Sequence, residues 1–473
     1  MLSRLDLVIV LAAGDGTRMK STTPKVLHRI AGQSILAHVL SATSKLEGKE
    51  LRVVIGAGKE LVAEELKVIA PNCKEIVQAV RGGTGQAARL ALVDAPKSGQ
   101  VLICAGDTPL LTSTTLSSLI EVHNKSGALA TVLTTELPDP FGYGRIVRDG
   151  SGVLASIVEE RDADEATKEI AEINSGVYVF DISALNSALA QIGKANAQGE
   201  EYLTDVIAIL KSQGHQVSTY QSADFTEILG INDRAQLSDV AALMRDRIND
   251  ALMRSGVTML DPASVWIDAT VEIEADVQIE PGVAIKGSSK IKSGAKIGPR
   301  TTLIDCEVGT GATVIESHCE SSEIGARAKV GPFAHLRGGT VLADEVKVGS
   351  FVEMKNSTVG EGSKVPHLSY VGDAQIGRES NIGAATIFVN YDGVSKHETK
   401  VGDHVRIGSD SMLIAPVEIG DGAYTAAGSI INEDVPAGAL GIARARQVNI
   451  LGWVLKKRKG TKSAEAAEKK ERK

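Results

Sequence analysis

The sequence is poor in aromatic residues and in cysteine. Only 3% of its 473 residues are Phe, Trp or Tyr, and this scarcity argues against single-stranded nucleic-acid binding, which needs aromatic stacking platforms. The cysteines include no closely spaced pair of the type that holds a metal ion. Because no secretion signal is present, we expect reduced thiols in a cytoplasmic protein. The cysteines are Cys73, Cys104, Cys306 and Cys319.

Excess positive charge and long apolar runs are also missing. The formal net charge is -8, so no global positive field would hold DNA, RNA or an anionic membrane. No apolar stretch approaches the ~18 residues of a membrane span. The run Leu7–Ala13 is short and ends in Gly-Asp-Gly-Thr-Arg. We therefore expect neither a nucleic acid nor a membrane as a partner.

Glycine, in contrast, is abundant, at 48 residues. Hydrophobic residues make up 43% of the chain, which is enough for a large core. Many glycines together with few rings predict tight, repeated turns rather than ring-stacked cores.

Residues 1–230 alternate short apolar runs with helix-length amphipathic stretches. This alternation predicts an α/β domain in which a parallel sheet carries helices on both faces. Ligands of such sheets sit beyond the carboxyl ends of the strands, which here means the loops after Leu11 and Cys104. The candidate strands are Asp6–Leu11, Leu51–Ile55, Val101–Cys104, Ala130–Thr134 and Val177–Phe180. The candidate helices are Ser34–Ser44, Lys59–Ile69 and Leu116–Lys125.

Residues 231–256 have a different pattern, which predicts a helical linker arm. Apolar residues recur there at three- or four-residue spacing from Asp233 to about Ser255, as expected of one amphipathic helix. They are Leu237, Val240, Met244, Ile248 and Leu252.

Residues 257–455 repeat an aliphatic residue every six positions. One inward aliphatic per six residues is the signature of a parallel β-helix, whose coils gain stability by stacking. The pattern becomes irregular at Ser350–Leu368 and at Phe388–Lys400, which we expect to be inserted loops. Residues 456–473 have no apolar stripe and are expected to form a disordered, charged tail. The first repeats begin at Val265, Val271, Val277 and Val283, and later repeats carry pairs such as Ile324-Gly325, Val330-Gly331 and Ile407-Gly408.

The run Leu11–Met19 (LAAGDGTRM) leads from a strand into a glycine-rich turn. Its glycines leave backbone N–H groups open to a phosphate, while Arg18 and Lys25 add positive charge. Met19 stands where a dinucleotide fingerprint has its third glycine, and no Gly-Lys-Ser/Thr follows as in a P-loop. An ordinary strand-to-helix turn also explains a Gly-x-Gly taken alone.

With Pro24-Lys25, this run resembles the signature of the sugar-1-phosphate nucleotidylyltransferases. A nucleotidylyltransferase domain, a helical arm and a hexapeptide β-helix together resemble the bifunctional enzymes of UDP-N-acetylglucosamine biosynthesis. The resemblance covers nearly all of residues 5–453 and implies a Rossmann-like domain followed by a left-handed parallel β-helix. Further motifs match in order: Gln78, Gly83-Thr84-Gly85, Gly106-Asp107-Thr108-Pro109, Tyr143-Gly144-Arg145-Ile146, Ile157-Val158-Glu159, Ile173-Asn174-Ser175-Gly176 and Gly230-Ile231-Asn232.

The resemblance implies two reactions of cell-wall precursor synthesis. The C-terminal domain would transfer an acetyl group from acetyl-CoA to glucosamine-1-phosphate. The N-terminal domain would then join N-acetylglucosamine-1-phosphate to UTP, with release of pyrophosphate and with Mg²⁺ as cofactor. The enzyme would be a cytoplasmic homotrimer with acetyl-transfer sites between subunits. Two other readings stay open from the residues alone: a nucleotidylyltransferase whose β-helix serves only assembly, and a sugar-nucleotide sensor.

The same resemblance assigns residues in the N-terminal domain. Lys25 and Arg18 would act in catalysis by neutralising the triphosphate. Asp107 and Asn232 would hold Mg²⁺, although Asp107 also suits a turn before Pro109 and Asn232 or Asp233 suits a helix cap. The nucleotide and the sugar would be bound by Leu11, Ala12, Ala13, Gly14, Lys25, Gln78, Gly83, Thr84, Gly144, Glu159, Asn174 and Asn232.

In the C-terminal domain the resemblance makes His367 the general base, because a sugar ammonium must lose a proton before it attacks a thioester. Glu353 would orient His367, and a backbone N–H or Tyr391 would donate to the oxyanion. Ala385 stands where the family pattern has glycine, so the local turn and the acetyl-CoA fit are expected to differ. Glucosamine-1-phosphate would be bound by Arg337, Lys355, Tyr370 and Asn381, and also by Asn390. Acetyl-CoA would be bound by Ala384, Asn390, Tyr391, Ser409, Ala427 and Arg444.

Overall fold

The computed structural model of the chain describes residues 5–46 and 50–471. It divides into two compact units, Met1–Glu272 with Pro281–Ser288, and Ile273–Glu280 with Ser289–Lys473. All four cysteines are free thiols, and burial raises the pKa of Cys104 and Cys319. Within the described residues no helix has the length and apolar character needed to cross a bilayer.

Unit 1 is built around a mixed sheet with strand order β11-β7-β10-β6-β1-β4-β5. The expectation of a wholly parallel sheet is wrong in one respect, because β10 runs antiparallel to β6 and β7. Between β7 and β10 the chain forms the β8–β9 hairpin and a four-residue helix, α5 (Glu165–Lys168), rather than the long crossover that parallel neighbours need. The strands are β1 (Leu7–Ala12), β4 (Glu50–Ile55), β5 (Lys74–Val77), β6 (Gln100–Ala105), β7 (Ala130–Glu136), β8 (Arg145–Arg148), β9 (Leu154–Val158), β10 (Glu172–Asp181) and β11 (Val217–Gln221), with a small pair β2 (Arg29–Ile30) and β3 (Gln33–Ser34).

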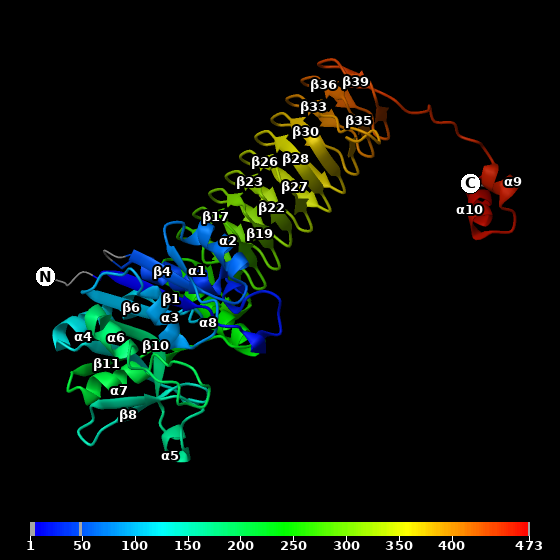
Figure 1. Ribbon diagram of the computed structural model, residues 1–473. Helices are drawn as coiled ribbons and strands as arrows, with labels where there is room; N and C mark the ends of the chain where they lie inside the picture. The colour runs from blue at the N-terminus through cyan, green and yellow to red at the C-terminus, as the bar shows by residue number, and fades with distance from the viewer. Residues whose placement is uncertain (1–4, 47–49, 472–473) are drawn as a thin grey trace. The chain divides into compact units, whose positions relative to one another are not determined.

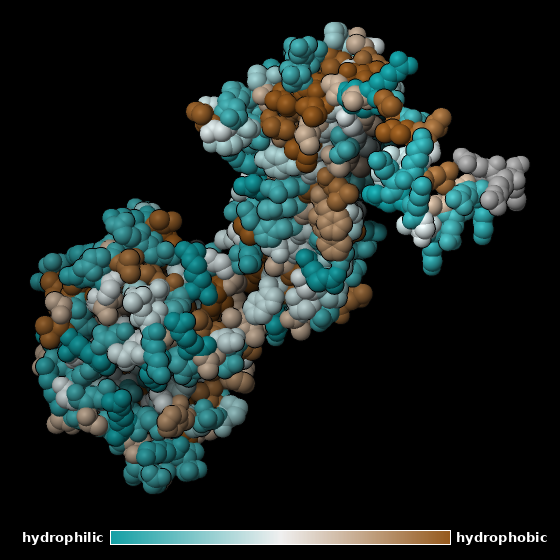
Figure 2. Space-filling model, turned by 90° about the vertical axis from the view of Figure 1, so that its right-hand side faces the viewer, coloured by the Kyte–Doolittle hydropathy of each residue, from teal (hydrophilic) through white to brown (hydrophobic). Residues whose placement is uncertain are grey.

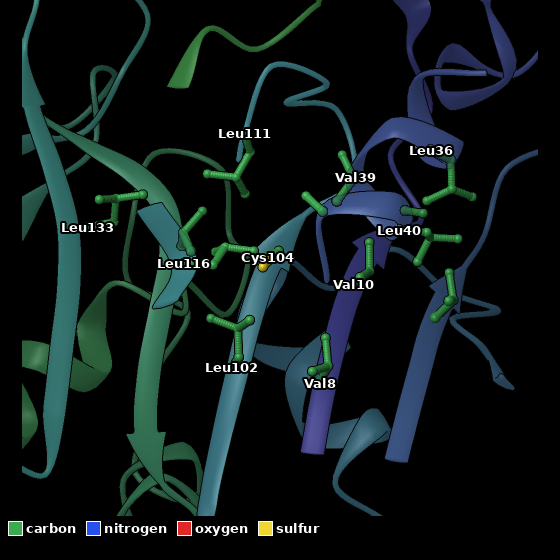
Figure 3. Packing of buried hydrophobic residues seen from close by; sticks show 14 of the residues in the cluster. Val8, Val10, Leu36, Val39, Leu40, Leu102, Cys104, Leu111, Leu116 and Leu133 are labelled. Atoms are coloured by element: carbon green, nitrogen blue, oxygen red, sulfur yellow. The ribbon is translucent and has the colours of Figure 1, made fainter. Parts of the chain in front are cut away.

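Helices cover both faces of this sheet because successive strand residues point to opposite sides. Val8 and Val10 of β1 pack with the cluster that contains α1, α2 and α4, as Figure 3 shows for α1 and α4. Leu7 and Ile9 pack with the cluster that contains α3, α6 and α7. These helices are α1 (Ile35–Ser44), α2 (Lys59–Ile69), α3 (Thr84–Ala91), α4 (Ser113–Ser126), α6 (Ile182–Leu189) and α7 (Asp205–Ser212). Short 3-10 turns are η1 (Thr17–Met19), η2 (Lys25–Leu27), η3 (Phe225–Ile228) and η4 (Pro262–Ser264).

The expected arm is a single helix, α8 (Arg234–Arg254). Asp233 caps it, because its carboxylate accepts from the Gln236 N–H at 2.9 Å. Val240 and Met244 are buried against Met19, Ile30, Ile35, Leu110 and Ile231. The helical periodicity of the sequence therefore marks the face that packs on the wound sheet domain.

The hexapeptide pattern predicts the β-helix correctly. Short parallel strands stack coil upon coil, as Figure 1 shows for unit 2. Aliphatic residues pair in register from coil to coil, for example Ile297 with Val314, Val314 with Val330, and Val348 with Val365. Their side chains are buried and form the axis of the core.

The strands of the β-helix fall into two series. The first strands along the chain are β12 (Thr258–Met259), β13 (Trp266–Ile267), β14 (Glu272–Ile273) and β16 (Ala284–Lys286). One series continues with β15 (Gln278–Ile279), β18 (Lys296–Ile297), β21 (Thr313–Val314), β24 (Lys329–Val330), β27 (Lys347–Ser350), β29 (Lys364–His367), β31 (Asn381–Ile382), β34 (Arg406–Ile407), β37 (Tyr424–Thr425) and β39 (Leu440–Gly441). The other contains β17 (Lys290–Ile291), β19 (Thr302–Ile304), β20 (Glu307–Val308), β22 (His318–Glu320), β23 (Ser322–Ile324), β25 (His335–Leu336), β26 (Thr340–Leu342), β28 (Glu353–Val359), β30 (Tyr370–Ile376), β32 (Ile387–Val389), β33 (Thr399–Val401), β35 (Met412–Ile414), β36 (Val417–Ile419) and β38 (Ile430–Ile431).

The two irregular stretches of the repeat have different structures. Ser350–Leu368 is not an insertion but a regular coil that contains β28, since Lys347 pairs with Lys364 and Tyr370 follows Glu353 in register. Residues 390–398 form the expected loop between β32 and β33. A coil without the insertion has 17 residues between paired positions, as from Tyr370 to Ile387. Across the insertion the paired positions Ala374 and Thr399 are 25 residues apart, so the coil is longer there.

The C-terminal tail differs from the expectation of disorder. It contains the short helices α9 (Trp453–Lys457) and α10 (Lys462–Glu471), which pack on each other. Alanine, lysine and glutamate are strong helix formers and dominate α10, so local propensity accounts for that helix without an extended apolar stripe.

Candidate active sites

A cavity of about 380 Å³ opens where β1 and β6 end. Its wall combines the end of β1 and the glycine-rich turn after it with residues from seven other segments of unit 1. The predicted nucleotide, sugar and metal residues that line it are Leu11, Ala12, Ala13, Gly14, Lys25, Gln78, Gly83, Thr84, Asp107, Gly144, Glu159 and Asn174.

Lys25 is the charged centre of this cavity. Its Nζ lies 2.5 Å from Asp107 Oδ2 and 3.4 Å from Asn232 Oδ1. These partners are 82 and 207 residues away along the chain, and the Lys25 side chain is only 11% exposed. The fold thus brings one ammonium group and two acceptor oxygens together at the cavity, although Asn232 itself does not line the cavity.

Local structure explains how these three side chains meet. Asp107 follows the carboxyl end of β6, and Lys25 begins η2 after Pro24. Gly16 has a φ of 58°, and a Cβ there would lie 2.7 Å from the Lys25 Cβ, so only glycine lets the turn approach Lys25 so closely. Because Asp233 takes the cap of α8, the Asn232 amide is free to face Lys25.

The oxygens of Asp107 and Asn232 fit a magnesium ion. Both converge on the same Lys25 ammonium, so they already face one cationic group. Carboxylate and amide oxygens are the hard donors that Mg²⁺ selects, and Mg²⁺ usually takes only one or two protein ligands beside water and phosphate. A cation held by these two oxygens would leave the Lys25 ammonium free to turn toward the cavity.

The far wall of the cavity is a polar cluster around Glu159. Thr204 Oγ1 donates to Glu159 Oε1 at 3.1 Å, and Asn174 Nδ2 donates to the Tyr178 hydroxyl at 2.7 Å. Burial raises the pKa of Glu159, the Thr204 hydrogen bond opposes this shift, and Asp162 and Asp205 add to it. These groups offer both donors and acceptors, as the recognition of sugar hydroxyls requires. Sequence analysis missed Thr204 and Tyr178 because neither belongs to a glycine-marked motif.

Near Gly83, Gln78 Nε2 donates to the Gly83 carbonyl at 3.1 Å and to Gln86 Oε1 at 2.9 Å. Arg81, also missed, lines the cavity and pairs with Asp15 at 3.1 Å and Glu200 at 2.9 Å. A single arginine between two loops carried no sequence pattern that would have distinguished it from a solvated side chain.

Arg18 is the predicted residue that the structure leaves apart. It lies on η1, is exposed, and is not part of the cavity wall.

In unit 2 a second set of polar side chains lines up on one outer face of the β-helix. Glu353 pairs in register with Tyr370, and Lys355 pairs with Gly372. Arg337 Nη1 donates to Glu353 Oε1 at 2.9 Å. The Glu353 carboxylate therefore holds Arg337, and the expectation that Glu353 orients His367 stays a prediction.

Two lysines meet on this face. The Lys396 ammonium beside Lys355 lowers the pKa of Lys355, because two adjacent positive charges disfavour each other. Sequence analysis missed Lys396, which lies in the inserted loop and outside the six-residue repeat. Two ammonium groups with Arg337 nearby make an electropositive place suited to a phosphate.

Tyr370 and Asn390 converge above Gly372. A Cβ on Gly372 would lie 2.5 Å from the Tyr370 hydroxyl and 2.7 Å from Asn390 Nδ2, so the missing side chain makes room for both. Asn390 Nδ2 also donates to Asp373 Oδ2 at 2.5 Å. Burial opposes it, but hydrogen bonds from Asn356 and Asn390 hold the pKa of Asp373 below its usual range. This hydrogen-bonded group sits beside the two lysines.

His367 is the first of a column of residues that lie at the same corner of the β-helix, one on each successive coil. The Ala385 N–H donates to the His367 carbonyl, the Asp410 N–H to the Ala384 carbonyl, and the Gly428 N–H to the Ser409 carbonyl. A Cβ on Gly428 would lie 3.8 Å from the Arg444 Cδ. The predicted residues aligned along this edge are His367, Ala384, Ser409, Ala427 and Arg444.

Two predicted residues lie off this edge. Tyr391 is exposed, and its hydroxyl donates to the Gly393 carbonyl within the inserted loop. Asn381 on β31 aligns with Lys364 and Arg406, and within the described residues no hydrogen bond joins it to Tyr370 or Lys355. The structure thus brings the sugar candidates Tyr370 and Asn390 together, but not Asn381.

Ala385 adopts the conformation that its position demands. Its φ is 58°, and the corner residues of the two adjacent coils, Leu368 (52°) and Asp410 (58°), are also left-handed. The expectation of a different turn is therefore not met: the coil imposes the left-handed corner, and Ala385 accepts the strain.

Comparison with known proteins agrees with the division of the chain into an α/β part and a β-helix. The family model described as a MobA-like NTP transferase domain matches residues 8–172, the GMPPB C-terminal domain matches residues 262–359, and the bacterial transferase hexapeptide matches residues 398–433. The bifunctional protein GlmU of Streptomyces avermitilis is 52% identical over 464 residues, covering 98% of this chain and 96% of its own length. The chain belongs to the GlmU family. GlmU of Thermobifida fusca is 50% identical over 471 residues, with 98% and 97% coverage, and GlmU of Corynebacterium glutamicum is 49% identical over 466 residues, with 98% and 96%.

Membership in the GlmU family confirms the predicted enzyme class. The protein is a bifunctional transferase with a nucleotidyltransferase domain and a hexapeptide acetyltransferase domain. The reading as a sensor without catalysis is excluded, and so is the reading of the β-helix as a mere scaffold.

Proposed function

We propose that the residues gathered in the two units perform the two steps of UDP-N-acetylglucosamine synthesis. On the β-helix, glucosamine-1-phosphate accepts the acetyl group of acetyl-CoA. In the cavity of unit 1, the product reacts with UTP to give UDP-N-acetylglucosamine and pyrophosphate. The observation that carries the assignment for unit 1 is that Asp107 and Asn232 meet at the Lys25 ammonium, which lines the cavity.

In the uridylyl transfer, a phosphate oxygen of the sugar phosphate attacks the α-phosphorus of UTP. A new P–O bond forms and the bond to pyrophosphate breaks, so no protein nucleophile is needed. Both reactants are strongly anionic, and the role of the protein is charge neutralisation and in-line positioning. Lys25 stabilises the negative charge of the triphosphate, while Glu159 and Asn174 orient the sugar and Gln78 and Gly83 contact the base.

Asp107 and Asn232 would hold Mg²⁺ in this reaction. When bound, Mg²⁺ supplies neutralisation of the phosphate charge that Lys25 alone leaves uncompensated.

In the acetyl transfer, Lys355, Lys396 and Arg337 hold the phosphate of glucosamine-1-phosphate, and Tyr370 and Asn390 orient its ring. His367 takes a proton from the sugar ammonium. The free amine attacks the thioester carbonyl, a C–N bond forms, and the C–S bond breaks to release CoA, whose sulfur takes up a proton. His367 is exposed, and within the described residues its ring has no hydrogen-bond partner, so both ring nitrogens are available for this role.

The column of corner residues supports a groove for acetyl-CoA. Ala384, Ser409 and Ala427 are small residues on successive coils, and Arg444 follows at the next coil. Small side chains leave space for an extended pantetheine arm that begins at His367. Arg444 supplies positive charge for the phosphates at the other end of CoA.

An apolar ladder supports assembly into a homotrimer. Phe333, Phe351 and Leu368 are each more than half exposed on successive coils, and the two phenylalanine rings stack with centroids 5.3 Å apart. On the face of the β-helix seen in Figure 2, apolar side chains gather in patches among polar ones. Contiguous exposed apolar residues are typical of subunit contacts. We propose a cytoplasmic trimer in which a neighbouring copy covers this ladder.

The direct test is a two-step assay of the full chain. Glucosamine-1-phosphate, acetyl-CoA, UTP and Mg²⁺ are supplied together, and CoA thiol, pyrophosphate and UDP-N-acetylglucosamine are measured. We expect all three products, with UDP-N-acetylglucosamine absent if either acetyl-CoA or UTP is omitted. Release of pyrophosphate without release of CoA would contradict the acetyl-transfer half of the proposal.

A further inference from the structure

Two histidines and a glutamate, none of which has been given a role above, form a compact cluster on the β-helix. His318 on β22 pairs in register with His335 on β25, one coil away. Cys319 and Leu336, the next residue on each strand, are completely buried. Because strand residues alternate in direction, His318, His335 and Glu320 all point outward on the same face.

The contacts within this cluster are close. His318 Nε2 lies 2.7 Å from Glu320 Oε1, and the two imidazole rings meet edge to face with centroids 5.4 Å apart. One ligand atom from each of the three side chains lies within 4.8 Å of the others. Within the part of the chain that the structure describes, this is the one group of three metal-ligating side chains gathered so closely.

We propose that His318, Glu320 and His335 bind a divalent transition-metal ion, of which Zn²⁺ is the best match. Two imidazole nitrogens and one carboxylate oxygen are a ligand set that zinc uses, with a fourth position left to water. Ligands about 2.0–2.2 Å from a tetrahedral zinc are roughly 3.3 Å from one another. The proposal requires the three side chains to rotate to that spacing while the strand register stays fixed.

Access and charge support this site. The side chains of His318 and Glu320 are 44% and 47% exposed, so an ion can reach them from solvent. Arg337 is the nearest opposing charge, and its guanidinium is already held by Glu353 at 2.9 Å.

The ion would tie two coils of the β-helix together. His318 and Glu320 belong to one coil and His335 to the next, so bound metal cross-links neighbours that otherwise share only strand hydrogen bonds and the inner core. Binding to the folded state alone would raise the temperature at which this coil pair unfolds. The site also lies directly beside Arg337, so a bound dication would strengthen the positive field around the proposed phosphate residues.

The test is calorimetric titration of the metal-stripped full chain with Zn²⁺ while Mg²⁺ is in large excess. Mg²⁺ occupies oxygen sites such as Asp107 and Asn232 but does not compete for imidazole. We expect one Zn²⁺ per chain at micromolar protein, and at least about tenfold weaker binding for His318→Ala, His335→Ala and Glu320→Gln. Replacement by Co²⁺ should give the visible absorption of a tetrahedral ion with nitrogen ligands in the wild type only.

A matched control is His397→Ala. His397 forms a histidine–carboxylate pair with Asp392 at the same 2.7 Å distance, but it has no second histidine beside it. Binding that survives in His397→Ala and is lost in the three cluster variants supports the site. Absence of Zn²⁺ binding in the presence of Mg²⁺, or equal binding by the wild type and all three variants, would overturn it. Melting of the metal-free variants at the wild-type temperature shows that loss of binding is not loss of fold.

Discussion

The two units build their sites in different ways. In unit 1, Lys25, Asp107 and Asn232 come from three loops that are far apart in the sequence, and the sheet brings them together. In unit 2, the site residues stand on neighbouring coils, so that Lys355 pairs with Gly372 and Glu353 with Tyr370, each 17 residues on. The α/β sheet thus brings together residues that are far apart in the sequence. The β-helix instead places residues about one repeat length apart side by side on adjacent coils.

This difference predicts how substitutions act. A side chain of the unit 1 cavity has partners that no other residue replaces, so its loss should be large and confined to one reaction. A phosphate-binding lysine of unit 2 has a second ammonium group beside it, as Lys396 has Lys355, so its loss should be smaller. The predictions below test this contrast from the largest expected effect to the smallest.

Asp107→Asn should have the largest effect. The substitution removes the negative charge that faces Lys25 and the proposed metal, so uridylyl transfer should fall by at least about a hundredfold. Acetyl transfer should stay within twofold. Pyrophosphate release and CoA release, measured on the same preparation, check this. Asp15→Asn is the control, because Asp15 pairs with Arg81 and not with Lys25; an equal loss in both variants would contradict the role of Asp107.

Lys396→Ala should weaken the acetyl-transfer site to a smaller extent. Removal of one of two adjacent ammonium groups should raise the KM for glucosamine-1-phosphate by about tenfold, with a smaller change in kcat. Lys400→Ala is the control, since Lys400 is an exposed lysine on β33 in the same region. Steady-state kinetics with varied sugar phosphate measure the effect, and an unchanged KM in Lys396→Ala would remove Lys396 from the phosphate site.

Glu159→Gln should weaken the binding of N-acetylglucosamine-1-phosphate without lowering the melting temperature at pH 7. Burial raises the pKa of Glu159, so the folded state holds this proton more tightly than the unfolded state does. Its contribution to stability therefore falls as pH rises through the ordinary carboxyl range. At pH 7 the variant should melt at the wild-type temperature or slightly above it, and at pH 4 the two should coincide. The KM for N-acetylglucosamine-1-phosphate should nevertheless rise about tenfold; a lower melting temperature at pH 7 would contradict the buried-charge account.

Ala385→Gly should have the smallest effect. Glycine relieves the left-handed strain at φ 58° but also gives the unfolded chain more freedom, so the free energy of unfolding should rise by only about 0.5 kcal/mol. The KM for acetyl-CoA should stay within twofold, because the turn already has the conformation that glycine would take. Denaturant titration followed by circular dichroism measures the first quantity. A clear loss of stability would show that the methyl group of Ala385 makes contacts that outweigh the strain.

The sequence predicted the elements of both units well where a period or a motif was present. Lys59–Ile69 and the arm helix were predicted almost to the residue, and the aliphatic period located the β-helix. The antiparallel β10 was missed because a short buried run carries no signal of strand direction. Ser350–Leu368 was taken for a loop because β28 passes a corner, which shifts the spacing without breaking the coil.

The sites show the same pattern. Cavity residues near glycines, such as Gly14 and Gly83, were predicted, but Thr204 and Arg81 lie outside any motif and only the fold brings them to the cavity. In the β-helix, Lys396 was missed because the inserted loop has no period. The ion pair of Glu353 with Arg337 was also missed, because no sequence pattern indicates it. Asp233 was one of two candidates for the cap of α8, and only the structure shows that it leaves Asn232 free.

The central claim is that each unit contributes its own, separate set of reacting groups. The most direct measurement compares Lys25→Ala and His367→Ala in the full-length enzyme, with CoA release and pyrophosphate release assayed independently. The account predicts that Lys25→Ala loses pyrophosphate release by at least about a hundredfold and keeps CoA release within twofold, and that His367→Ala does the reverse. Loss of both activities in either folded variant would contradict it.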